Sequence, residues 1–159
     1  MIEHRALVHK LMLAVNRIDE IFALEARALG LKENTLALFY ALDDGKAHSQ
    51  SQVSQEWLIP KTTINTIVKE CVENDLIVLE PEEHGREKMI RLTEKGSDLT
   101  RTLLTKIYEI EDRAMEETVE DCTEKFVNDL TQYSIHLQDR VLEALELTKD
   151  MQRGMKHKI

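Results

Sequence analysis

The spacing of hydrophobic residues changes twice along this chain, and this change constrains the fold more than any other feature. Up to about residue 74, apolar residues recur every three or four positions, which is the spacing of one helix face. Residues 76–79 and 89–92 are instead short apolar runs separated by the charged stretch PEEHGREK, the pattern of two strands joined by an exposed loop. Beyond Thr93 the helical spacing returns. The sequence therefore predicts a mainly α fold with a small β-hairpin.

The first three predicted helices are delimited by residues that stop or begin helices. One covers about residues 3–28, where Gly30 stops it, and a second covers about residues 33–43. The third begins at Ser49, because Ser49 and Gln52 have the spacing of a capping box. One long helix therefore precedes two short ones.

The fourth predicted helix begins at Pro60 and has two different faces. Proline suits the first turn of a helix because the backbone N–H at that position has no helical partner. The buried stripe is expected to contain Ile64, Ile67, Val68, Cys71 and Val72. The outer face then carries cations and short hydrogen-bonding side chains, which are Lys61, Thr62, Asn65, Thr66 and Lys69, with Thr63 at its border. Such groups suit base edges and phosphates, although the same pattern alone also fits an ordinary solvated face.

The last two predicted helices are long and amphipathic. Thr93 can cap the fifth, which continues to about Val119. The sixth has one apolar face formed by Phe126, Leu130, Tyr133, Leu137, Val141 and Ala144. Apolar faces of this length on terminal helices find too little partner surface within one small domain, so we expect a symmetric homodimer.

Length and composition narrow the class of protein. A chain of 159 residues corresponds to about one domain. No apolar run approaches the ~20 residues of a membrane span, and the N-terminus lacks the apolar core of a signal peptide, so we expect a cytoplasmic protein without membrane contact. The net charge of −9 is concentrated in the C-terminal helices. At a Debye length of ~8–10 Å, those acids do not exclude DNA as a partner elsewhere.

Motifs of catalysis and metal binding are missing from the sequence. There is no glycine-rich phosphate loop, nucleophile elbow or HExxH motif. Cys71 and Cys122 do not have the spacing of metal ligands. We therefore expect neither an enzyme nor a bound metal or cofactor. Cys71 is expected to be a small core residue, and whether either cysteine senses redox conditions stays open.

The order of the elements, short helices followed by strand, charged loop and strand, is the plan of a winged helix-turn-helix. Three stretches carry a more specific likeness: ALGLKENTLALFYAL, SQSQVSQEWLIPKTTINTIVKECVENDLIVLE and EEHGREKMIRLTEKG. Together they resemble the MarR family of bacterial transcriptional regulators over about residues 28–97. The sequence departs from the family pattern in two places: the wing has His84, Gly85 and Arg86 where Asp-Arg-Arg is usual, and Asp75 stands where glycine is common.

This resemblance implies a division of the chain and a mode of action. Residues 31–97 would form the winged helix-turn-helix DNA-binding domain, residues 1–30 and 98–150 the helical dimerisation region, and residues 151–159 a basic tail. The homodimer would bind a pseudo-palindromic operator in double-stranded DNA and act as a repressor or an activator, with repressor as the favoured role. A small aromatic or amphipathic effector would release it.

Specific contacts to DNA are expected from the fourth helix and the wing. Asn65 can make two hydrogen bonds to an adenine base, whereas Lys61 and Lys69 suit phosphates. In the wing, Arg86 suits a narrow minor groove. The complete predicted set is Lys61, Thr62, Thr63, Asn65, Thr66, Lys69, Arg86 and Lys88.

A second hypothesis is a winged-helix module that binds other proteins and not DNA. The acidity of the chain and its irregular wing are the grounds for this alternative. Salt dependence separates the two hypotheses, because binding through several phosphates weakens steeply as salt rises.

Overall fold

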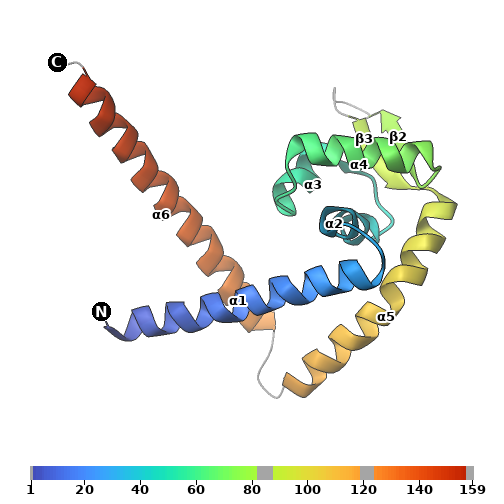
Figure 1. Ribbon diagram of the computed structural model, residues 1–159, viewed down its shortest axis with the longest axis horizontal. Helices are drawn as coiled ribbons and strands as arrows, with labels where there is room; N and C mark the ends of the chain where they lie inside the picture. Colours follow the sequence, from blue (N-terminus) through green and yellow to red (C-terminus); the bar gives the residue numbers. More distant parts are fainter. Residues whose placement is uncertain (1, 82–87, 119–123, 157–159) are drawn as a thin grey trace. The chain divides into compact units, whose positions relative to one another are not determined.

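The computed structural model describes residues 2–81, 88–118 and 124–156, and within them it contains six helices and three strands (Figure 1). In chain order these are α1 (Ile2–Ala28), α2 (Glu33–Leu42), β1 (His48–Ser49), α3 (Gln50–Glu56), α4 (Lys61–Glu73), β2 (Ile77–Pro81), β3 (Lys88–Leu92), α5 (Glu94–Thr118) and α6 (Glu124–Lys156). The predicted mainly α class with a small hairpin is confirmed. No helix in the described ranges is long and apolar enough to cross a membrane.

The chain divides into two compact units, residues 1–109 and residues 110–159. The first unit contains α1 to α4, the sheet and the greater part of α5, and it holds all of the predicted DNA-contacting residues. The second unit contains the end of α5 and α6. The first unit is therefore the one that positions the candidate site.

The sheet is antiparallel, with strand order β1-β3-β2. The hairpin pairs Ile77 with Leu92 and Pro81 with Lys88, and β1 pairs His48 with Ile90 on the other side of β3. The sequence predicted only the hairpin. Two residues are too few to give an alternating pattern, so β1 is recognisable only through its pairing with β3.

The core of the first unit forms where α2, α3 and α4 pack against the sheet. Figure 1 shows these helices grouped together, with the hairpin beside α4. The largest fully buried side chains come from different elements and include Phe39, Leu42, Val53, Ile64 and Ile90. Cys71 is buried as predicted, and desolvation raises the pKa of its thiol to about 11. Its thiolate is therefore scarce at neutral pH.

The prediction that Val72 is buried is wrong. Ile64, Ile67, Val68 and Cys71 are buried, but Val72 is 37% exposed. Successive residues are about 100° apart around a helix, so Val72 lies at the margin of the stripe that the other four residues define.

The start of α5 is bonded closely to the chain that follows α4. Thr93 donates its side-chain hydroxyl to the carbonyl of Asp75 (2.7 Å), and the same oxygen accepts the Gly96 N–H (2.9 Å), which confirms the predicted cap. The Thr93 N–H donates to the Leu76 carbonyl (3.0 Å). A Cβ on Gly96 would lie 2.0 Å from that same Leu76 oxygen. We call this contact the α4–α5 joint.

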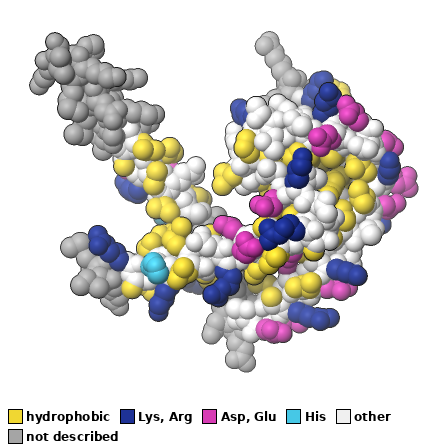
Figure 2. Space-filling model, viewed as in Figure 1, with side chains coloured by type: hydrophobic (Ala, Val, Ile, Leu, Met, Phe, Trp, Pro, Cys, Tyr) yellow, Lys and Arg dark blue, Asp and Glu magenta, His cyan; other side chains and the backbone are white. Residues whose placement is uncertain are grey.

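Large apolar side chains remain exposed on the long helices. On α1 these are Leu7, Val8, Met12, Leu13, Ile18, Ile21 and Leu24, and on α6 they are Phe126, Val127, Ile135, Leu137, Val141, Leu142 and Leu145. Figure 2 shows hydrophobic side chains open to the surface along both helices. Among the described residues of one protomer, these apolar side chains of α1 and α6 stay exposed to solvent.

We expect Gly96→Ala to destabilise the protein by about 2 kcal/mol or more, because the new methyl group would overlap backbone and not a flexible side chain. Urea denaturation followed by circular dichroism measures this loss. Gly45→Ala is the control for steric overlap, since Gly45 has a positive φ of 73° but has open space where the methyl group would lie. Its cost should be about 1 kcal/mol. Equal losses in the two variants would contradict the close packing at Gly96.

Candidate nucleic-acid interface

The outer face of α4 carries the helix residues predicted to contact DNA. Lys61, Thr62, Asn65, Thr66 and Lys69 are exposed, and Thr63 is half-buried at the border of the face. This arrangement follows from the buried stripe, because Ile64, Ile67 and Val68 hold the opposite side of the helix against the core.

Most of these side chains are available to a ligand. The Thr66 hydroxyl donates to the Thr62 carbonyl one turn earlier (3.0 Å), which leaves its lone pairs free. Lys69 lies 3.8 Å from the Glu73 carboxylate, but both side chains are more than half exposed, so this ion pair is weak. Within the described part of the chain, the Asn65 amide makes no hydrogen bond. The face therefore presents amide, hydroxyl and ammonium groups together.

A hollow of about 240 Å³ lies on one flank of α4, which we call the wing-side hollow. Asn65 lines it from α4, Lys88 from β3, and Gln50 and Ser51 from the first turn of α3. The structure thus brings together Asn65 and Lys88, which the sequence predicted separately. Gln50 and Ser51 were missed, although the capping signal at Ser49 placed the start of α3 correctly.

A second hollow, of about 280 Å³, lies between α2 and α4, and we call it the α2-side hollow. Thr62, Thr63 and Thr66 line it from α4, together with Lys32 and Asn34 at the start of α2; Ile67 and Glu70 complete the lining. Lys32 and Asn34 were not predicted, because no sequence pattern indicates that the start of α2 reaches the outer face of α4.

The wing is built on a braced hairpin stem. Lys88 is exposed at the start of β3, and Arg91 forms an ion pair with Glu80 of β2. Arg86 lies in residues 82–87, outside the described residues, and so do His84 and Gly85. The structure therefore places Lys88 beside α4 but leaves the predicted contact of Arg86 as an expectation.

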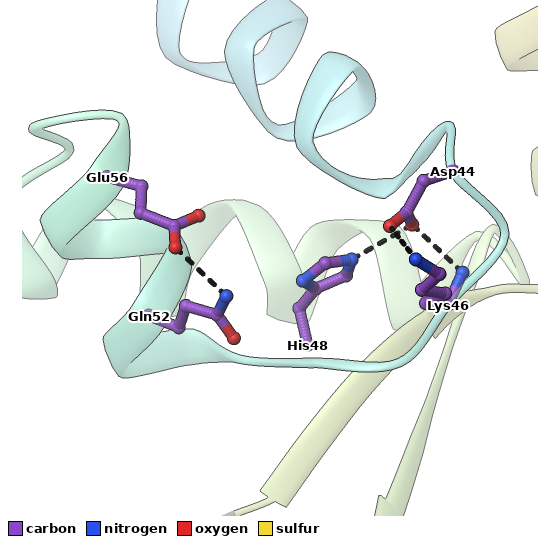
Figure 3. A network of polar contacts seen from close by, with 5 residues as sticks. All are labelled: Asp44, Lys46, His48, Gln52 and Glu56. Atoms are coloured by element: carbon purple, nitrogen blue, oxygen red, sulfur yellow. Dashed lines mark hydrogen bonds and ion pairs between the residues drawn. The ribbon is translucent and has the colours of Figure 1, made fainter. Parts of the chain in front are cut away.

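A polar network holds the loop between α2 and β1 (Figure 3). Asp44 Oδ1 accepts the backbone N–H of Lys46 and the His48 Nε2–H, each at 2.9 Å. These bonds hold the pKa of the Asp44 carboxyl below its usual value of 3.8, the bond from His48 being the larger cause. Nearby on α3, Gln52 donates to Glu56 (2.9 Å). The network anchors His48, which pairs β1 with the central strand of the wing sheet.

Residues 29–87 match the MarR family model, which confirms the resemblance expected from the sequence. This segment contains α2, α3, α4 and β2, and therefore the outer face of α4. Comparison with curated proteins gives no match.

Solved structures with the same fold include regulators of that family. A MarR family regulator from Neisseria meningitidis is 22% identical, with a TM-score of 0.75 over 86% of this chain and 97% of that one. A MarR family transcriptional regulator from Silicibacter pomeroyi is 18% identical, with a TM-score of 0.66 over 82% and 94%. NadR, solved in complex with 4-hydroxyphenylacetate, is 15% identical, with a TM-score of 0.65 over 78% and 88%. The winged helix-turn-helix fold is thereby confirmed.

The Asp44–His48 pair predicts a definite dependence of stability on pH. A carboxyl whose pKa is lowered by folding stabilises the protein above its unfolded pKa, and this contribution is lost as the pH falls through the folded pKa. We therefore expect the free energy of unfolding to fall more steeply in the wild type than in Asp44→Asn as the pH falls through and below the usual carboxyl pKa of 3.8. Urea denaturation at each pH measures it. Parallel curves would show that the pair contributes nothing.

Proposed function

We propose that this chain, which matches the MarR family over residues 29–87 and has the fold of MarR family regulators, is a sequence-specific DNA-binding transcriptional regulator. The observation that carries this proposal is the outer face of α4. Within a winged helix-turn-helix, that face presents Thr62, Asn65 and Thr66 between two hollows and keeps all three side chains exposed. A helix of this kind fits the major groove.

In the proposed complex the exposed side chains have different roles. Asn65 makes two hydrogen bonds to an adenine base, and the neighbouring base edges are contacted by Thr62, Thr63 and Thr66. Lys61 and Lys69 neutralise phosphates, as does Lys88 from β3. Arg86 enters the minor groove from the wing loop. The α4 contacts therefore determine sequence preference, while the lysines provide affinity.

The net charge of −9 does not oppose this role, because charges act over short distances in physiological salt. Most of the acidic excess belongs to residues 110–150, outside the unit that contains α4. At the site itself Lys61, Lys69 and Lys88 provide positive charge. An ionic-strength series tests the alternative role in protein binding, because affinity for DNA falls linearly with log salt when phosphates are neutralised.

We further propose that the protein acts as a homodimer. The exposed apolar side chains on α1 and α6 follow one another along each helix, whereas surface hydrophobics are normally scattered singly. A second copy of the chain would bury them in a symmetric interface. Residues 1–30 and 98–150 then form the dimerisation region, residues 31–97 the DNA-binding domain, and residues 151–159 a basic tail. Two α4 helices related by a two-fold axis call for a pseudo-palindromic operator.

The proposed regulator is a cytoplasmic repressor that a small aromatic or amphipathic effector releases from its operator. NadR in complex with 4-hydroxyphenylacetate supports an effector of this class. In this chain, Tyr40 of α2 packs its ring against those of Phe22 and Trp57 (centroids 5.8 Å apart in both pairs) and of Tyr108 (5.6 Å). Tyr40 is thus the centre of an aromatic cluster that joins α2 to α1, to α5 and to the residue that ends α3, and aromatic rings suit contacts with an aromatic ligand.

We expect Asn65→Ala and Thr66→Ala to weaken binding to the operator by about 1–3 kcal/mol and to random DNA very little, because base contacts are lost. Lys69→Ala is the contrasting variant and should weaken both alike and flatten the salt slope, since it removes a phosphate contact. Gel-shift titrations with the DNA flanking the coding region and with a random duplex measure the ratio. Equal losses on both duplexes for Asn65→Ala and Thr66→Ala would show that α4 does not read the sequence.

Leu137→Asp should convert the dimer to a folded monomer, because the side chain is 45% exposed in the protomer and would be buried only in the interface. Light scattering at micromolar concentration measures the mass, and circular dichroism checks the fold. Gln132→Asp is the matched control, since it adds the same charge on the opposite side of α6, and it should stay dimeric. A monomeric wild type would refute the proposed assembly.

A further inference from the structure

The two hollows occupy opposite flanks of the outer face of α4. Thr62 and Thr66, one turn apart, line the α2-side hollow, whereas Asn65 lines the wing-side hollow. Residues 65 and 66 are about 100° apart around the helix axis, so the two flanks face in different directions. A ligand that covers the outer face of α4 therefore meets both hollows.

DNA has a matching geometry. The major groove is about 12 Å wide and is bounded by a phosphate backbone on each side, so a helix that enters it has phosphates on both flanks. The wing-side hollow supplies one cation, Lys88, and the α2-side hollow supplies another, Lys32. Lys88 beside the wing can contact only one of the two phosphate backbones that bound the groove.

We propose that the α2-side hollow binds a phosphate of the DNA backbone through Lys32 and Asn34, an inference that rests on the proposed DNA-binding function. The ammonium of Lys32 and the amide of Asn34 are donors, and the hydroxyl of Thr62 lies on the same hollow. Phosphate oxygens accept from the ammonium and from the amide. This contact makes α2 part of the DNA-binding surface.

Lys32 is free to make this contact. It is the N-cap residue of α2, yet its side chain makes no capping hydrogen bond and is exposed. Within the described residues it forms no ion pair. The helix behind it is held in place, because Leu36, Ala37 and Leu38 are buried in the next turn. Lys32 therefore extends from a rigid support next to α4.

Glu70 is the one carboxylate among the residues that line this hollow, and it limits where the phosphate binds. It lies eight positions after Thr62 along α4, which corresponds to about 12 Å of helix. The phosphate accordingly binds at the Thr62 end, away from the negative charge. Glu70 then marks the boundary of the DNA-facing surface.

Lys32→Ser tests this site without weakening the fold. Serine is a favoured N-cap residue, so the variant should be as stable as the wild type or more stable. Binding to a random-sequence duplex should weaken about 3–10-fold in about 0.1 M salt, and the slope of log affinity against log salt should fall by about 0.9 for each lost phosphate contact. Lys32→Arg should retain affinity, because the cation remains.

Lys106→Ala on α5 is the matched charge control, since Lys106 is exposed and lines neither hollow. It should leave affinity and salt slope unchanged. Unchanged affinity and slope in Lys32→Ser, alongside weaker binding in Lys69→Ala, would refute the phosphate site and leave the DNA-binding function intact. A wild-type protein that binds neither operator nor random DNA would refute both.

Discussion

The contact between Gly96 and the Leu76 carbonyl supports the arrangement of the whole DNA-binding unit. Because residue 96 has no side chain, α5 can start directly against the chain leaving α4. Thr93 then bonds both Leu76 and Asp75, and Lys95 Nζ donates to the Asn74 carbonyl (2.7 Å). These bonds join the end of α4, the β2–β3 hairpin and the start of α5 at one place. A shift of α5 would therefore be transmitted to α4, which carries the proposed DNA-contacting face.

Chain direction at this joint depends on Asp75. Its φ of 58° is in the left-handed region. The family that this chain resembles commonly has glycine at this position. The strain of a non-glycine residue there is small, since aspartate tolerates this region better than most residues do. The carbonyl of Asp75 accepts the Thr93 hydroxyl, which holds the turn in place. The hairpin can thus leave α4 sharply and return beside it, so that Lys88 comes to line the same hollow as Asn65.

Local signals were sufficient for much of the fold and for part of the candidate site. The capping hydrogen bond from Gln52 N–H to Ser49 Oγ (3.0 Å) and the cap at Thr93 each lie within a segment of four residues. Likewise, the stripe from Ile64 to Cys71 by itself separates the two faces of α4. Val72 was assigned to the core wrongly because a periodic pattern does not show where the packed surface ends. Strand β1 and the residues Lys32, Asn34, Gln50 and Ser51 had no local signal, because their roles depend on neighbours distant in the sequence.

By itself the sequence determined which residues of α4 are buried and which are exposed, where the helices begin, and that a hairpin follows α4. Each of these features depends on the spacing of residues within one or two turns, which hydrophobic burial and capping convert directly into local structure. Only the tertiary structure decided what surrounds the exposed face. The packing of α2 and α3 against α4 places Lys32 and Asn34 on one flank and Gln50 and Ser51 on the other. Such neighbours are brought together by the shared core, and the distances between them in space are not encoded in any short stretch of the chain.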